Sequence, residues 1–353
     1  MRVVVIGATG NAGTSTVRAL AADPAVDSIV GIARRLPALV VPKTSWATAD
    51  VTTTDLEPLL RGADAVIHLA WRIQPSRDER ITYTVNVRGS ARVFDAAARA
   101  RVGAVVYASS VGAYAPGPKD RAVDESWPTT GIPTSFYSRH KAEVERLLDV
   151  FEREHPGVRV VRLRPGLVFQ REAAAEIRRL FVGPLLPGAL VRRRLVPVVP
   201  HTPRLRFQAV HSADVGQAYR AAALSGVRGA FNVAADPVLD GPALARILGA
   251  RPVRVPPGVL RGAAALTWRL RLQPTPPGWV DLALGVPLMD TTRARRELGW
   301  TPSRSAVEAF EELFDGLREG SGAPTPPLDP HAGGPARVRE LFTGIGGRSR
   351  QNG

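Results

Sequence analysis

The sequence contains no cysteine, only two methionines and, among 47 basic residues, only three lysines. Without cysteine the chain has no disulfide, no thiolate nucleophile and no cysteine-ligated zinc or iron–sulfur centre. Its six histidines show neither HxxxH nor HxH spacing, so the sequence predicts no metal site.

Long uncharged apolar runs are also missing. The richest stretch, residues 259–272, is interrupted by Arg261, Arg269 and Arg271. The N-terminal run at residues 3–6 is too short for a signal peptide, and glycines follow it at once. We therefore expect a soluble, cytoplasmic protein without a membrane partner.

Acidic residues are outnumbered by basic ones, which gives a net charge of +15. A positive field of this size attracts polyanions. The arginines are nevertheless dispersed, with short clusters such as Arg192-Arg193-Arg194, and no aromatic residues interleave them. We expect a small-molecule substrate rather than nucleic acid, and a homodimer stays open.

Apolar β-branched runs alternate with alanine-rich helical stretches in the first half, at residues 3–6, 28–33, 65–70, 104–109 and 158–163. This alternation predicts βαβ units, and hence an α/β fold with a doubly wound parallel Rossmann sheet and a smaller C-terminal substrate lobe. The runs are continuously apolar, as expected for parallel strands covered on both faces.

The expected domains follow from changes in this rhythm. The dinucleotide-binding core is assigned to residues 1–169 and is completed by about 206–235. The substrate lobe takes residues 170–205 and 236–319. Residues 320–353 are rich in glycine, proline and arginine with little apolar periodicity, so we expect a mostly disordered tail.

A loop of small residues follows the first expected strand and reads Gly7-Ala8-Thr9-Gly10-Asn11-Ala12-Gly13. Small residues let the backbone approach a pyrophosphate, which then lies at the positive end of the following helix. The position directly after a strand makes the pattern specific. The sequence therefore predicts a dinucleotide site formed by Gly7, Thr9, Gly10, Asn11, Ala12 and Gly13.

Tyr137 and Lys141 lie one turn apart in residues 134–154, which we expect to be helical. A tyrosine with a pKa near 10 is a poor proton acceptor unless a cation lowers that pKa. With five tyrosines and only Lys43, Lys119 and Lys141 as lysines, YxxxK is expected by chance roughly 0.04 times. The pair is predicted to be an acid/base centre for an alcohol or ketone.

The glycine loop and this pair resemble the extended short-chain dehydrogenase/reductase family, also called the NAD-dependent epimerase/dehydratase family, whose loop reads GATGxxG. The resemblance runs through about Ser305. It implies that Ser110 is the catalytic hydroxyl, that Lys141 bonds the nicotinamide ribose and that Asn86 supports this lysine through water. Ser109 stays open as the alternative to Ser110, since adjacent residues at a strand end point oppositely.

The resemblance also implies further cofactor contacts. They lie in the adenine-recognition pair, in the segment that closes the fourth strand beside the diphosphate, and in the segment that meets the carboxamide. Trp71 stands where the family usually has a small residue. The implied set is Asp50, Val51, Leu69, Ala70, Trp71, Ser109, Tyr137, Lys141, Pro165, Gly166 and Val168. Two later stretches, residues 211–215 and 297–302, match the family's His-x-x-Asp-Val box and C-terminal signature.

The second expected strand ends in Arg34-Arg35. The family typically has an acidic residue here, which selects NAD by bonding the ribose hydroxyls. Two guanidinium groups instead suit a 2′-phosphate. We therefore predict NADP as the preferred cofactor and keep NAD as possible.

The residues beside Ser110 narrow the reaction. Sugar dehydratases of the family carry an Asp-Glu pair after the catalytic hydroxyl because elimination needs its own acid and base. Val111-Gly112 stands here, so we expect no dehydration. We predict an NAD(P)-dependent oxidoreductase that acts on a sugar nucleotide or another hydroxyl or carbonyl compound. An NAD-dependent nucleotide-sugar 4-epimerase and a non-catalytic NADP(H)-binding regulator are the alternatives.

Overall fold

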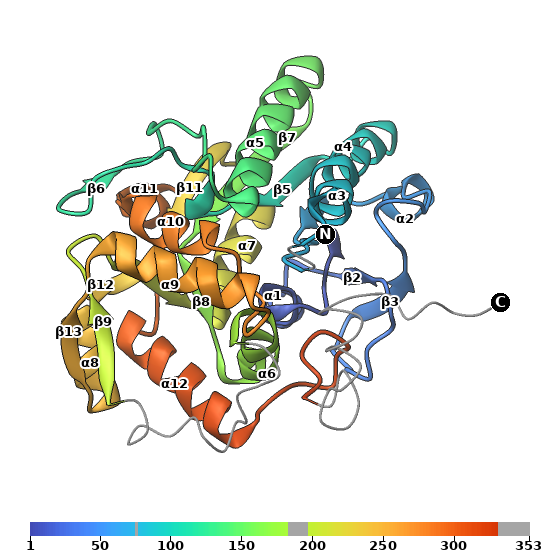
Figure 1. The fold of residues 1–353 in the computed structure, drawn as a ribbon. Coiled ribbons are helices and arrows are strands. Elements are labelled where there is room, and N and C mark those ends of the chain that lie inside the picture. Colours follow the sequence, from blue (N-terminus) through green and yellow to red (C-terminus); the bar gives the residue numbers. More distant parts are fainter. Residues whose placement is uncertain (75–76, 183–196, 331–353) are drawn as a thin grey trace.

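The computed structural model describes residues 1–74, 77–182 and 197–330 (Figure 1). Its central sheet has, within these ranges, seven parallel strands. Their order is β3 (Thr44–Thr48), β2 (Ser28–Ala33), β1 (Arg2–Ile6), β4 (Ala65–His68), β5 (Ala104–Ala108), β7 (Arg159–Pro165) and β11 (Gly229–Val233). The strand order reverses between β1 and β4, where ligands of such sheets bind. The predicted doubly wound α/β fold is confirmed.

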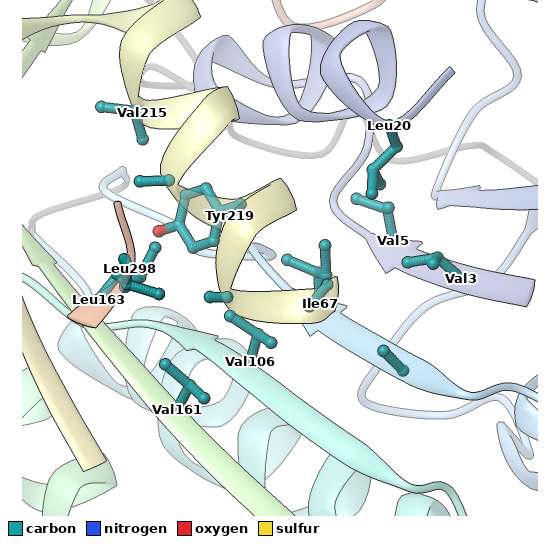
Figure 2. Packing of buried hydrophobic residues seen from close by; sticks show 14 of the residues in the cluster. Val3, Val5, Leu20, Ile67, Val106, Val161, Leu163, Val215, Tyr219 and Leu298 are labelled. Carbon is teal, nitrogen blue, oxygen red and sulfur yellow. The ribbon is translucent and has the colours of Figure 1, made fainter. Parts of the chain in front are cut away.

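Helices cover both faces of this sheet. Residues of β1 alternate between them, because Val3 and Val5 pack toward α1 (Asn11–Ala21) and α7 (Ser212–Leu224), and Val4 packs toward α4 (Gly89–Arg99) and α5 (Phe136–Glu154). Figure 2 shows the first face, where Tyr219 of α7 lies among valines and Ile67 of the strands. Each fully buried aliphatic side chain contributes about 1.5–3 kcal/mol.

The other elements of the core region are short. They are α2 (Glu57–Leu60), α3 (Glu79–Tyr83), the π-helical turn η1 (Thr84–Arg88), η2 (Val111–Ala113), β6 (Ala122–Val123), β8 (Leu167–Phe169), η3 (Arg171–Ala173), α6 (Ala174–Ile177) and η4 (Arg178–Val182). No helix in the described part of the chain is long and apolar enough to span a membrane.

The later residues build small sheets and a helical layer. The strands β9 (Val198–His201), β10 (Arg206–His211), β12 (Ala235–Asp240), β13 (Arg251–Arg254) and β14 (Leu288–Met289) pair as β12-β10-β8, β13-β9 and β14-β6. The helices are α8 (Gly241–Leu248), α9 (Pro257–Arg269), α10 (Gly278–Gly285), α11 (Thr292–Glu297) and α12 (Ala306–Glu319). Substrate binding by this lobe stays a prediction, and the cluster Arg192-Arg193-Arg194 lies outside the described residues.

Local capping fixes where two important helices begin and end. Ser135 caps α5 by accepting a hydrogen bond from the Ser138 N–H, which puts Tyr137 in the first turn. Helix α12 begins with a reciprocal cap between Ser305 and Glu308, and Gly320, whose φ is 69°, caps its C-terminus after Glu319. The chain reverses there, and residues 321–330 pack back onto the core region. Residues 331–353 lie outside the described part.

Candidate active site

The glycine loop leaves β1 and enters α1 with almost no room for side chains. Gly7 has a φ of +85°, and a Cβ there would lie 2.6 Å from the backbone nitrogen of Ala70. A Cβ on Gly13 would overlap the carbonyl oxygen of Gly7. Around Gly10 the nearest atom to such a Cβ is 3.7 Å away. The first and third glycines therefore close the loop against neighbouring backbone, and the second leaves space at the helix N-terminus.

A cavity opens at this loop, at the carboxyl ends of the first strands. Most of the predicted adenosine and phosphate contacts line it, namely Gly7, Thr9, Gly10, Arg34, Arg35, Asp50, Val51, Leu69, Ala70 and Trp71. Asn11, Ala12 and Gly13 lie in the first turn of α1 and are not among the residues that line the cavity. Glycine backbone, a helix N-terminus and two guanidinium groups suit the diphosphate and adenosine parts of a dinucleotide. The residues present therefore fit a nicotinamide dinucleotide.

Two charged positions of the cavity have defined partners. The Asp50 carboxylate accepts hydrogen bonds from the Thr52 N–H at 2.9 Å and from its hydroxyl at 2.6 Å, which fixes the turn after β3. Partial burial and the nearby cations Arg34 and Arg179 lower the pKa of Arg35. Asp329 opposes this shift.

Tyr137 and Ser110 lie outside the cavity lining, and the Tyr137 ring contacts Trp71, which belongs to that lining. The Tyr137 ring and the Ser110 hydroxyl both border Gly112, and the Ser110 oxygen accepts the Gly112 N–H at 3.0 Å. Burial raises the pKa of Tyr137, and Ser110 opposes that shift. A Cβ on Gly112 would lie 2.8 Å from the Tyr137 ring. A side chain at position 112, where a dehydratase would need a carboxylate, would therefore have to displace the Tyr137 ring.

Lys141 lies one turn beyond Tyr137 and is almost fully buried. Its ammonium donates to the Ala108 carbonyl at 2.6 Å and lies 3.4 Å from the centre of the Trp71 indole. Burial holds the pKa of Lys141 well below its usual value, and Glu145 opposes the shift. A cation in such surroundings releases its proton more readily than a solvated lysine.

Aromatic rings enclose the acid/base pair. Trp71 meets the Tyr137 ring edge-on with centroids 5.8 Å apart, and Trp279 of α10 lies 5.0 Å from it on a tilted plane. The Trp71 ring nitrogen is buried without a hydrogen-bond partner among the described residues. Trp71 thus belongs to both parts of the site, because it lines the cavity and covers Lys141.

Ser109 and Asn86 have partners other than the acid/base pair. The Ser109 hydroxyl donates to Glu145 at 2.5 Å, so Ser110 is the serine beside Tyr137. Asn86 of η1 accepts from the Arg72 N–H at 2.7 Å and donates to its carbonyl at 2.8 Å. Asn86 thereby holds the backbone next to Trp71, and its predicted role at Lys141 stays a prediction.

Glu145 is a functional candidate that the sequence analysis missed. Burial acts to raise its pKa, but Arg164, Arg162 and Ser109 together hold it below the usual value. Arg164 lies 2.8 Å from the carboxylate and Arg162 lies 3.1 Å from it. Its spacing of four residues from Lys141 could have revealed it, since residues i and i+4 share a helix face.

The remaining predicted residues connect the loop to the rest of the fold. Pro165 ends β7, Gly166 donates to the Val233 carbonyl at 3.0 Å, and the Val168 carbonyl accepts from the Asn11 side chain at 2.9 Å. None of these three lines the cavity described above. Their contact with a carboxamide stays a prediction.

The later motifs and His68 have structural roles. The Trp300 indole donates to the Asp214 carbonyl at 2.7 Å, and Ser303 donates twice to the Asp214 carboxylate, so the two late motifs hold each other. His68 is bonded to Ser90 at 2.9 Å, and burial followed by the charge of Lys141 lowers its pKa to about 3. His68 is therefore a neutral core histidine.

Comparisons with known proteins agree with this geometry. The profile of the NAD dependent epimerase/dehydratase family matches residues 3–234. An uncharacterized protein of Mycobacterium tuberculosis is 28% identical over 93% of this chain and 86% of its own length. The L-arabinose 1-dehydrogenase (NAD(P)(+)) of Haloferax volcanii is 30% identical over 50% of this chain and 70% of its own length.

Solved structures share the fold at low identity. The Thermus thermophilus UDP-glucose 4-epimerase in complex with NAD has a TM-score of 0.67 and 22% identity, and the match covers 90% of this chain and 99% of that one. The Bacillus cereus UDP-glucuronic acid 4-epimerase in complex with UDP-glucuronic acid and NAD has a TM-score of 0.66 and 19% identity, and the match covers 90% of this chain and 99% of that one. The family predicted from the motifs is confirmed. The chain belongs to the NAD dependent epimerase/dehydratase family and is an enzyme of its epimerase or dehydrogenase type.

Proposed function

We propose that the chain transfers hydride between a nicotinamide dinucleotide and a secondary alcohol or ketone, with Tyr137 as the acid/base. The observation that carries this proposal is that the Ser110 hydroxyl and the Tyr137 ring both border Gly112, with Lys141 on the next turn of α5. These groups stand beside a cavity that fits the adenosine and phosphate parts of the cofactor. A proton donor and a cofactor cavity are what this reaction requires.

The proton path runs through Tyr137. A bound dinucleotide supplies the hydride in reduction and accepts it in oxidation. Ser110 holds the substrate oxygen, and the Tyr137 phenol gives its proton to that oxygen in reduction and takes one from it in oxidation. Because burial raises the pKa of Tyr137, the phenol is protonated at neutral pH, which favours reduction.

Lys141 adjusts this proton transfer. When it is charged, its field stabilises the phenolate and lowers the pKa of Tyr137. Glu145 favours the charged lysine, and burial under Trp71 disfavours it. Alcohol oxidation needs the phenolate, so its rate should rise with pH toward and beyond about 10.

Cofactor choice depends on the charges in the cavity. We keep NADP as the preferred cofactor because Arg34 and Arg35 can bond a 2′-phosphate, and NAD as the alternative. The relative from Haloferax carries both cofactors in its name, and the neighbouring structures hold NAD. Glu176 also lines the cavity, and its carboxylate repels the 2′-phosphate of NADP when it is ionised. Titrating the purified protein with NADPH and NADH decides between them.

A nucleotide-sugar 4-epimerase is the second candidate. It is favoured by neighbouring structures that bind UDP-sugars together with NAD and cover 90% of this chain. Epimerisation uses the same serine, tyrosine and lysine, but the hydride returns to the substrate and no external dinucleotide is consumed.

The experiment that tests the proposal is a turnover screen. Ketones, sugar nucleotides and secondary alcohols are incubated with NADPH, NADH or their oxidised forms, and dinucleotide absorbance and sugar configuration are both followed. Net, stoichiometric absorbance change supports the oxidoreductase. Interconversion of sugar epimers without net change makes the chain an epimerase. Binding of dinucleotide without turnover of any substrate class favours the non-catalytic regulator and contradicts the proposal.

A further inference from the structure

Beyond α12, the last helix in the described part of the chain, the backbone returns to the cofactor cavity. We call residues 321–330 the C-terminal strap. Gly320 reverses the chain, and the Ser321 N–H donates to the Gly316 carbonyl at 2.9 Å. Ala323 and Leu328 are buried against Ala173 and beside Ile177. The strap is thus packed onto the segment around α6, and it lies beyond the residues that match the family profile.

Hydrogen bonds tie the strap to two cofactor-binding segments of the core. The Thr325 hydroxyl donates to the carbonyl of Thr9 in the glycine loop at 2.9 Å, and only 1% of Thr325 is exposed. The Ala38 N–H donates to the Pro324 carbonyl at 3.1 Å. The strap therefore bridges the phosphate loop and the segment that follows β2.

The strap also holds two cations, of which Arg35 lines the cavity and Arg179 belongs to η4. Arg35 donates to the Pro326 carbonyl at 3.5 Å, and Arg179 of η4 donates to the Pro327 carbonyl at 3.0 Å. Both prolines line the cavity together with Arg35. The two carbonyls thus accept hydrogen bonds from two guanidinium groups that lie close enough for the charge of Arg179 to lower the pKa of Arg35.

We propose that the C-terminal strap is a wall of the dinucleotide cavity that positions Arg35 and Arg179 and slows the departure of the bound dinucleotide. The inference rests on the proposed dinucleotide site but concerns different residues, so its test can fail alone. The strap adds cover to the adenosine side without touching Ser110 or Tyr137. Dissociation should therefore change more than proton transfer.

Two truncated chains, each compared with the full-length protein, test the proposal. One ends at Pro330 and removes residues 331–353, and the other ends at Gly320 and removes the strap as well. NADPH and NADH dissociation is followed by stopped-flow fluorescence after mixing with excess oxidised dinucleotide. We expect the chain ending at Pro330 to match the full chain, and the chain ending at Gly320 to release dinucleotide at least about tenfold faster.

A point variant keeps the test sharp if the shorter truncation does not fold. Thr325→Val keeps the shape but removes the bond to Thr9, and we expect about three- to tenfold faster release. Ser321→Ala is the control, because its hydroxyl faces the exposed Glu319. Equal release rates for Thr325→Val, Ser321→Ala and the full chain overturn the strap proposal and leave the proposed function standing. If the full chain binds neither dinucleotide, the cavity assignment fails and the strap proposal with it.

Discussion

The two ends of the site are built from different chemistry. At the charged end Arg34 and Arg35 are exposed to water, Glu176 is half-buried, and Pro326 and Pro327 of the strap complete the lining. The aromatic end places Lys141 and Tyr137 between Trp71 and Trp279. Charges near water are screened and adjust affinity in small steps, whereas charges in a dry surrounding shift pKa values strongly. We infer that the charged end sets which dinucleotide binds and the aromatic end sets the chemistry.

The largest effect on the free energy of unfolding is expected from removing Glu145, the buried carboxylate next to the aromatic end. Glu145→Ala leaves Arg162 and Arg164 without their shared partner, and removal of one member of a buried ion pair costs about 3–5 kcal/mol of unfolding free energy. Urea unfolding measures this loss. Glu57→Ala is the control, since its ion pairs with Arg61 and Arg99 lie at the surface.

The pH dependence of stability gives a second reading of the same site. The pKa of Glu145 is lowered in the folded chain, so its contribution is present above the unfolded value of about 4.3 and is lost as pH falls through the lower, folded value. Glu145→Ala should weaken this acid-side loss. An unchanged unfolding free energy in the variant contradicts the assigned role.

Removing the cation of Lys141 should lower turnover, which depends on the aromatic end, and should leave dinucleotide binding at the charged end nearly unchanged. Lys141→Met is expected to lower turnover by about 100-fold or more, because the phenolate of Tyr137 loses its stabilising charge. Dinucleotide affinity should stay within a few-fold. Lys43→Met is the matched control, since that lysine bonds the Asp23 carbonyl at the surface. A loss of affinity that equals the loss of turnover would place Lys141 in binding alone.

Uncovering the lysine should move the pH profile. Trp71→Ala lets water solvate the ammonium, so the pKa of Lys141 rises toward its usual value and the pKa of Tyr137 falls. The pH profile of alcohol oxidation should then shift by about one unit toward acid. Trp268→Ala, which removes an indole that stacks on Arg77, should leave the profile in place. An alkaline shift in Trp71→Ala is the opposite of this expectation.

The smallest effect is expected at the charged end. Burial raises the pKa of Glu176 to about 7, and Arg179 opposes the shift. As pH rises through that value the carboxylate ionises, and NADPH binding should weaken by roughly fivefold relative to NADH. Glu176→Gln should remove this difference, and Glu172→Gln, which changes a residue outside the cavity lining, should keep it. Equal pH dependence for both dinucleotides in the unaltered chain would show that Glu176 does not discriminate.

The sequence predicted those parts of the site that depend on the spacing of residues within one short segment. The loop from Gly7 to Gly13 and the pair Tyr137 and Lys141 are short patterns on one strand end and one helix face, so their geometry follows from the backbone. The doubly wound parallel sheet was predicted from the alternation of apolar runs with helical stretches. The family and the doubly wound sheet were therefore predictable.

Contacts between distant segments were not predictable. Thr325 meets Thr9 across 316 positions, and Glu176 enters the cavity from a segment with no motif. The choice between Ser109 and Ser110 depended on where Glu145 lies. Trp71 was expected beside the cofactor, but its position over Lys141 is a tertiary contact that no spacing encodes.

Tyr137→Phe tests the central claim most directly when dinucleotide binding and hydride transfer are measured on the same sample. The change removes one hydroxyl, and Tyr83→Phe removes another that bonds Glu143 away from the site. We predict that Tyr137→Phe binds dinucleotide within a few-fold of the unaltered chain and loses turnover by about 10²–10⁴-fold, while Tyr83→Phe keeps both. Full turnover in Tyr137→Phe would contradict the assignment of Tyr137 as the acid/base.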